Sequence, residues 1–167
     1  MHSIGDPQSA YNRLMQLAQL NIGRLVDDPD SDAVAEFMNA IAAINLLGES
    51  SPGFVWMLKD DEGVGATGLR YPGHEDDEQF IVNLTVWDDF DAMRHFVTRS
   101  GHGMYLRRRQ EWFEKSPEAT TVLWWVPDDH RPNLVEGAER LEALRRRGPT
   151  AYAFDMRAQF EQDGTST

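Results

Sequence analysis

The sequence predicts a single domain of the α+β class. Its 167 residues are 41% hydrophobic and include no cysteine, so the chain is long enough to bury a core without disulfides. Strand-like and helix-like segments follow one another in the order β-α-β-β-α-β, and a further α-β pair is added at the C-terminus. One strand-like segment is apolar on both sides, which indicates that both faces of the sheet are covered.

The first half of the chain contains two strands and one helix. Residues 1–13 are polar and are interrupted by glycine and proline, so we expect a flexible arm. Residues 14–25 alternate in a way that favours a strand. Apolar side chains recur at helical spacing from Val34 to Gly48, and residues 54–58 are rich in the bulky side chains typical of strands.

A long loop opens the second half. Residues 60–79 hold four glycines and seven acidic residues, and a loop of this length in a compact domain is more often functional or mobile than inert. Residues 80–87 (FIVNLTVW) give the clearest strand of the chain. The helix that follows is expected to reach Phe113, and Gly101 and Gly103 in its middle predict a kink or a break.

The C-terminal third predicts a strand at 121–126, a helix and a last strand at 151–156. Asn133, with Glu136 three residues later, resembles a capping box and opens a helix that is expected to end near Arg147. We therefore divide the chain into a flexible arm at 1–13, a domain at 14–156 and a disordered tail at 157–167.

The first six elements match the ferredoxin-like arrangement, in which two helices cover one face of an antiparallel sheet. Both sides of the 80–87 strand are largely apolar, yet helices on one side cover only one face. The second face is therefore expected to pack on another sheet, and the natural partner is a second copy of the chain. The sequence thus predicts a homodimer.

Charge and composition exclude several classes of function. The formal net charge of −12 argues against nucleic-acid binding, since phosphate backbones require a basic surface. No apolar run is long enough for a membrane span, and the N-terminus lacks the features of a secretory signal, so we expect a cytoplasmic protein. Thiolate metal sites need cysteine, and a shared metal between His95 and His102 fails because seven helical residues separate them by roughly 10 Å along the axis.

Six segments of the sequence carry a resemblance to a known family. They are SPGFVW at 51–56, GAT at 65–67, VNLTVW at 82–87, FVTRSGH at 96–102, RRRQEWF at 107–113 and LWWVP at 123–127. Together they resemble a little-characterised bacterial family of the dimeric α+β barrel superfamily, beside the antibiotic-biosynthesis monooxygenases. The resemblance covers roughly residues 14–156. It implies a dimeric α+β barrel whose ligand pocket lies between the sheet and its covering helices.

Polar and aromatic residues on the predicted strands are expected to line such a pocket. They are Asn21, Trp56, Asn83, Trp87 and one of Trp124 and Trp125, with Asn45 from the first helix. Adjacent tryptophans on a strand point to opposite faces, so only one of the last two is expected at the pocket. A mostly aromatic pocket with a few polar groups suits a flat organic ligand; packing in the core is the alternative for each tryptophan.

His102 is the candidate catalytic base. In a continuous helix it shares a face with Arg99 and Arg109, and a histidine titrating near neutrality can accept the proton of a phenol while an arginine holds the anion. An exposed helix face with ion pairs to acidic neighbours is the alternative. Asn21 and Asn83 are candidates to polarise or hold the same anion.

The resemblance implies an enzyme of secondary metabolism that oxygenates an aromatic or polyketide-like substrate without a bound cofactor. The alternatives are a haem enzyme with His102 as axial ligand, an oxygen-independent cyclase or isomerase, and a non-catalytic ligand-binding module. The segment 63–68 (GVGATG) has the letters of a dinucleotide fingerprint, but no helix follows it and acidic residues flank it, so we interpret it as a flexible loop.

Overall fold

The computed structural model describes residues 14–99 and 102–167, with the backbone alone at His102. The predicted arm at 1–13 lies outside the described residues. The elements are β1 (Met15–Arg24), α1 (Ala35–Glu49), β2 (Phe54–Met57), β3 (Phe80–Trp87), α2 (Phe90–Arg99), α3 (His102–Arg107), the short 3-10 helix η2 (Arg109–Glu111), β4 (Thr121–Pro127) and α4 (Leu134–Arg147).

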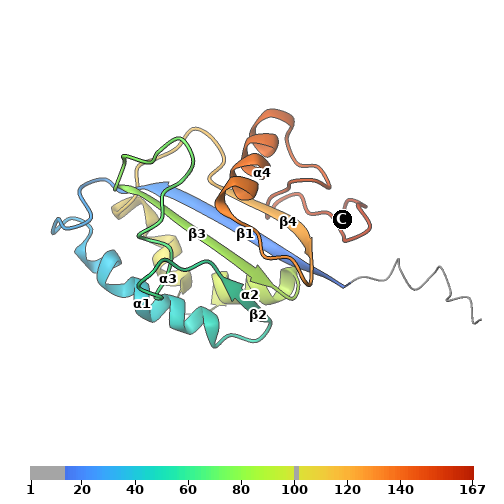
Figure 1. Cartoon of the computed structure of the whole chain (residues 1–167), viewed down its shortest axis with the longest axis horizontal. Helices are drawn as coiled ribbons and strands as arrows, with labels where there is room; N and C mark the ends of the chain where they lie inside the picture. Colours follow the sequence, from blue (N-terminus) through green and yellow to red (C-terminus); the bar gives the residue numbers. More distant parts are fainter. Residues whose placement is uncertain (1–13, 100–101) are drawn as a thin grey trace, which may run out of the picture.

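The strands form one antiparallel sheet in the order β2-β3-β1-β4 (Figure 1). β1 lies in the middle, and its Asn21 pairs with Asn83 of β3 on one side and with Thr121 of β4 on the other. This strand order and the succession of elements confirm the predicted α+β, ferredoxin-like arrangement. None of the helices in the described ranges is long and apolar enough to cross a membrane.

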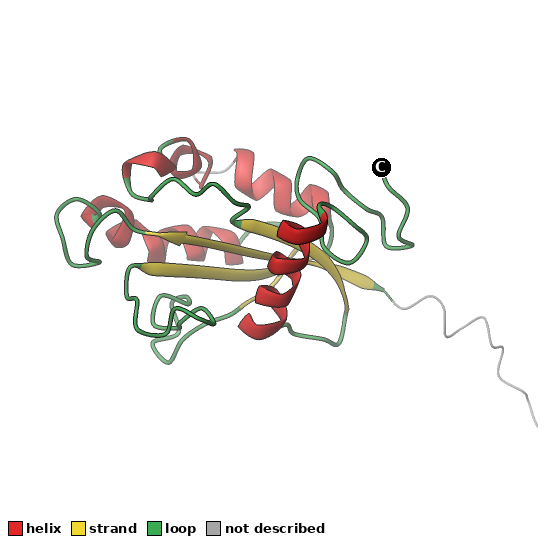
Figure 2. Ribbon diagram, turned by 90° about the horizontal axis from the view of Figure 1, so that it is seen from above, coloured by secondary structure: helices red, strands yellow, loops and turns green. Residues whose placement is uncertain are grey.

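The helices α1, α2 and α3 cover one face of the sheet, which we call the helix face. Leu17, Trp87 and Leu123 point to this face and pack with Met93 and Phe96 of α2. Figure 2 shows the layers: the sheet lies between helices on one side and α4 together with the loop that follows β2 on the other. The ring of Phe96 stacks on Trp87 with the two centroids 5.2 Å apart, so α2 is held directly on the sheet.

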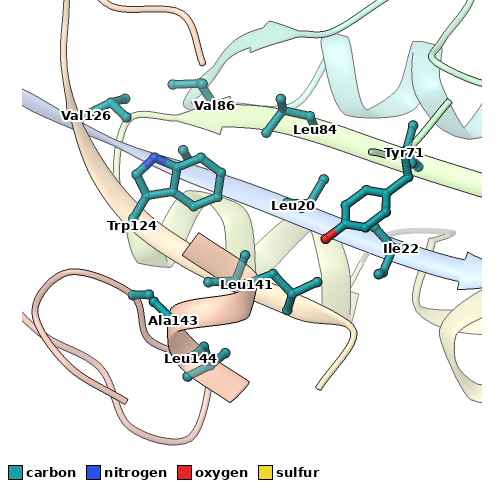
Figure 3. Packing of buried hydrophobic residues seen from close by; sticks show 14 of the residues in the cluster. Leu20, Ile22, Tyr71, Leu84, Val86, Trp124, Val126, Leu141, Ala143 and Leu144 are labelled. Atoms are coloured by element: carbon teal, nitrogen blue, oxygen red, sulfur yellow. The ribbon is translucent and has the colours of Figure 1, made fainter. Parts of the chain in front are cut away.

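The opposite face, expected to be bare, is covered by the chain itself. Leu20, Leu84 and Val122 of this face are 0% exposed in the single chain. Leu141 and Leu144 of α4 pack on them, and so do residues of the long loop; Figure 3 shows Tyr71 from this loop on the same side of the strands as Leu141. The prediction of a bare face was therefore wrong, because α4 and residues 60–79 supply the second layer. Dimerisation is not needed to bury this face and stays a prediction.

A hydrogen-bond network at its first turn holds α4 in place. The Asn133 side chain accepts from the backbone N–H of Glu136 at 2.9 Å, which confirms the predicted cap. In a capping box the Glu136 side chain would bond back to the backbone of Asn133. It instead accepts the indole N–H of Trp124 at 2.9 Å and contacts Nε2 of His130 at 2.6 Å. One carboxylate therefore joins the helix start to the fully buried tryptophan beneath it.

Two expectations for the C-terminal region need correction. The last strand is reduced to a single bridge between Leu123 and Phe154, so no strand spans 151–156. The segment 157–167 was expected to be disordered, but its Phe160 carbonyl accepts the Trp125 indole N–H at 2.7 Å. Phe160 also bridges to Ser166, so the segment folds back on itself beside β4. The ring of Phe160 packs against Phe154 beside β4, a contact that the mostly polar composition of the segment does not reveal.

The predicted break in the second helix is confirmed. The chain forms α2, α3 and η2 in place of one helix. At Gly103 a Cβ atom would lie 2.9 Å from the carbonyl oxygen of Thr98, closer than real Cβ contacts allow. A glycine at 103 therefore lets the chain turn closely past the end of α2 and present α3 to the helix face.

Candidate functional site

A cavity of about 190 Å³ lies between the helix face of the sheet and the helices. Its roof is mostly apolar and its floor is polar. The roof includes Phe37, Ile41, Ile44, Phe96, Val97, Tyr105 and Leu106, and the floor includes Gln19, Asn21, Asn83, Thr85 and Thr121. Such a cavity suits a small apolar ligand that carries a few hydrogen-bonding groups.

The floor residues fall into two rows because strand side chains of one face recur at every second residue. Asn21 lies in the first row, between Asn83 and Thr121. Gln19 lies in the second row beside Thr85. Directly opposed side chains have Cβ atoms about 5 Å apart, so each row presents its polar groups to the same part of a ligand.

Arg109 of η2 is the charged group at the floor. It donates to Oδ1 of Asn21 at 3.2 Å and to the carbonyl of Ile22 at 2.9 Å. Burial lowers the pKa of its guanidinium from the ordinary value. The group stays protonated at neutral pH because arginine titrates far above it. A partly desolvated cation with spare donors favours an anionic or strongly polarised oxygen.

A glycine makes room for this arginine. A Cβ atom at Gly23 would lie 2.6 Å from Cδ1 of Phe113 and 2.9 Å from a terminal nitrogen of Arg109. The guanidinium also lies over the Phe113 ring, 4.9 Å from its centroid. Gly23 thus allows η2 to approach the sheet, which brings the charge into the cavity.

The amide of Asn83 is uncommitted. No hydrogen bond joins its side chain to any of the described residues, although it lines the cavity directly opposite Asn21. An amide offers both a donor and an acceptor. Asn83 therefore keeps both its donor and its acceptor for a ligand.

Asn45 connects the long loop to α1 at the cavity wall. It is 9% exposed, and its side chain donates to the carbonyl of Val64 at 3.0 Å. Ala66 and Thr67, which follow Gly65 in the same loop, line the cavity. A Cβ atom at Gly65 would lie 2.4 Å from the Asn45 amide nitrogen, so the fit requires glycine. The segment interpreted as a flexible loop thus forms a wall of the cavity.

The structure brings together most of the residues that the sequence proposed for a pocket. Asn21, Asn45, Asn83, Trp87 and Arg109 all line the cavity. The backbone of His102 begins α3, the helix that carries the lining residues Tyr105 and Leu106. The His102 side chain lies outside the described part of the chain.

Trp56 and both members of the Trp124–Trp125 pair, of which one was expected at the pocket, lie elsewhere. Trp56 packs against the core of the opposite face, and so does Trp124, whose indole N–H is bound by Glu136. Trp125 points to the helix face as the alternation predicts, but the C-terminal segment covers it, and Phe160 accepts its N–H. The sheet is covered on both faces by the chain itself, so neither of the paired tryptophans borders the cavity.

Sequence reasoning missed Gln19, Thr85, Thr121 and Tyr105. The first two were within reach, because Gln19 lies two residues from Asn21 and Thr85 two from Asn83, on the same side of each strand. Thr121 required the β1–β4 register, and Tyr105 required the break that separates α3 from α2. Neither follows from periodicity.

The described residues offer neither a cluster of metal ligands nor a slot wide enough for a haem. Among residues 14–99 and 103–167, no group of three or more histidine, aspartate or glutamate side chains could hold a metal ion. A haem requires a wide apolar slot. The cavity measures about 190 Å³ and has a floor of amides and hydroxyls, so the macrocycle does not fit between this sheet and these helices.

Comparisons with known proteins identify a family but not an activity. No curated protein matches the chain. Two structures of SnoaB, described as a cofactor-independent oxygenase from Streptomyces nogalater, are similar at 20% and 18% identity, with TM-scores of 0.43 and 0.42. Each match covers 71% of this chain and 96% of that chain.

A protein of unknown function from Nitrosomonas europaea is similar at 9% identity, with a TM-score of 0.44, over 73% of this chain and 97% of that chain. A family model described as a domain of unknown function, DUF3291, matches residues 16–167, nearly the whole chain. The chain therefore belongs to the DUF3291 family.

Proposed function

We propose that this protein is a small-molecule enzyme that oxidises a phenol with dioxygen, without a bound cofactor. One observation carries the proposal: an uncommitted amide, Asn83, and a half-buried guanidinium, Arg109, lie together at the polar floor of a cavity whose roof is mostly apolar. Hydrogen-bond donors in a site that excludes water stabilise an oxyanion far better than donors in solvent.

The reaction is a deprotonation followed by attack of the anion on dioxygen. The phenolate oxygen is held by Arg109 and Asn83, and its charge is delocalised to the para carbon. That carbon forms a bond to dioxygen. One oxygen atom is kept as the new carbonyl oxygen, and the other leaves as water with the two hydrogen atoms that the substrate loses. The substrate supplies all the electrons, so no reductant is required.

His102 is the proposed proton acceptor. It is the first residue of α3, whose Tyr105 and Leu106 line the roof above the floor amides. The imidazole of a histidine changes its charge near physiological pH. Its neutral form accepts the phenolic proton, and its protonated form returns that proton to a peroxide oxygen without external acid. Replacement by alanine should therefore abolish turnover but leave ligand binding intact.

The volume of the cavity limits the size of the substrate. An engineered cavity of about 150 Å³ in another protein accepts benzene. At about 190 Å³, this cavity accommodates one substituted ring or two fused rings. We therefore propose a small phenol or naphthol, in place of the larger polyketides that the family resemblance also allowed. We retain secondary metabolism, a cytoplasmic location and a homodimer as parts of the proposal.

The test is to incubate the purified protein with alpha-naphthol and to measure the uptake of dioxygen. Absorbance spectroscopy monitors the formation of para-naphthoquinone in the same reaction. We expect one dioxygen consumed per quinone. Asn83→Leu should lower the rate by about 100-fold, the typical effect of losing one donor to an oxyanion. Asn39→Leu, on an exposed site of α1, is the matched control and should leave the rate unchanged.

Other outcomes favour the alternatives. Conversion that continues in the absence of dioxygen would identify a cyclase or isomerase acting through the same groups. Ligand-dependent melting shifts with no conversion across a panel of phenols and quinones would identify a binding module. Either result contradicts the oxygenase.

A further inference from the structure

We propose that Gln19 is a specificity-determining residue that binds the second oxygen of a para-dioxygenated ring. The inference rests on the proposed function, since it assumes that the first oxygen lies at the first row of the floor, where Arg109 and Asn83 hold it and Asn21 lies beside them. Gln19 is 8% exposed, lines the cavity and belongs to the second row of the floor. Its side chain takes no part in holding Arg109, so its role is separate from that of Asn21.

A relay of hydrogen bonds fixes the orientation of the Gln19 amide. The indole nitrogen of Trp87 donates to Oγ1 of Thr85 at 3.0 Å, and an indole N–H has no other role than donor. Thr85 therefore keeps its own hydroxyl proton for a second partner. That partner is Oε1 of Gln19, at 3.4 Å. With its oxygen occupied, the amide turns its NH₂ group toward the cavity.

Asn21 is oriented in the same sense. Its Oδ1 accepts from Arg109, which is only a donor, so its NH₂ group also remains available. The two amides lie two residues apart on the same face of β1, at a separation of about 6.6 Å along the strand. The floor thus offers two donors and suits a ligand with two acceptor oxygens at opposite ends of one ring.

This spacing assigns a part to each row in the reaction. The phenolate oxygen lies at the first row, and the para carbon then faces the second row. The oxygen that bonds to this carbon develops negative charge beside the NH₂ group of Gln19. Trp87 acts as a positioning residue in this step, since its indole N–H is bound to Thr85, which in turn holds the Gln19 amide.

The test is a comparison of two ligands by titration calorimetry, without turnover. The probes are para-naphthoquinone, which has two carbonyl oxygens, and alpha-tetralone, which has one. The absence of cysteine prevents thiol addition to the quinone. We expect the wild-type protein to bind the quinone about tenfold more tightly, the effect of one additional hydrogen bond at the upper end of its usual range.

Gln19→Met keeps the length of the side chain but removes the donor. It should abolish the preference and leave the affinity for alpha-tetralone unchanged, a result that a general loss of structure would not produce. Gln16→Leu is the control, because Gln16 lies on the same strand but belongs to the other face, where it contacts Arg131. Gln19→Leu provides a second variant if the first does not fold.

Equal affinity of the wild-type protein for the two probes, a preference that survives in both Gln19 variants, or no binding of either probe would overturn the inference. The proposed function is measured separately by dioxygen uptake. Selective binding without uptake would support the role of Gln19 and contradict the oxygenase, whereas uptake without selectivity would do the reverse.

Discussion

The cover that α4 provides to the sheet predicts a large effect of Leu141→Ala. Leu141 is 0% exposed and belongs to the core cluster on the opposite face of the sheet. Truncation of a fully buried leucine costs about 2–5 kcal/mol, because apolar contacts are lost and a cavity remains. We take a loss of about 3 kcal/mol in the free energy of unfolding. For a chain of this size each kcal/mol lowers the midpoint of thermal unfolding by about 2–4 °C, so the midpoint should fall by about 6–12 °C.

The measurement is thermal and urea unfolding followed by circular dichroism at several protein concentrations. Val135→Ala is the control: Val135 lies on the same helix but is 59% exposed, so the change should stay within about 0.5 kcal/mol. The reasoning fails if the two variants have equal stability. It also fails if Leu141→Ala has no effect while the wild-type midpoint rises with concentration, since a partner and not α4 would then cover the sheet.

Two further predictions concern the loop wall of the cavity and the ion pair between Glu36 of α1 and Arg108. Gly65→Ala places a Cβ atom 2.4 Å from the nitrogen of the Asn45 amide, so it should detach the loop from α1. Amide hydrogen exchange should then become faster in residues 60–68 but not in β3. Unchanged exchange in residues 60–68 would refute the proposed wall. A hydrogen bond from Arg108 lowers the pKa of Glu36 below its ordinary value of 4.5. The stabilisation from the ionised Glu36 carboxylate is therefore present above pH 4.5 and is lost as the pH falls through its folded-state pKa. The difference in melting temperature between the wild type and Glu36→Gln should accordingly shrink in acid. A difference that stays constant with pH would contradict the role of this ion pair.

Strand periodicity predicted much of the fold and part of the site. The FIVNLTVW segment forms β3 over the expected residues, and the spacing of Asn83 and Trp87 puts both side chains on the helix face. Local chemistry also identified the Asn133 cap of α4. These features depend on neighbours in the sequence, which is why the sequence reveals them.

Long-range packing accounts for the failures. The sequence correctly showed that the opposite face of β3 is apolar. Whether α4, the long loop or a second chain covers this face depends on packing between distant segments. Strand alternation sets the face to which each of Trp124 and Trp125 points, but what covers each ring depends on distant partners, Glu136 for Trp124 and Phe160 for Trp125. Each partner is distant enough in the chain that no periodic pattern connects it to the tryptophan.

The central claim is that the amides beneath α1 and α3 bind an oxygenated aromatic ligand. Side-chain amide resonances of the isotope-labelled protein test it most directly, since each NH₂ group reports its own surroundings. Addition of para-naphthoquinone should shift the resonances of Asn21, Asn83 and Gln19 and leave that of exposed Asn39 in place. Shifts confined to surface amides, with the three floor amides unmoved at saturation, would contradict the account.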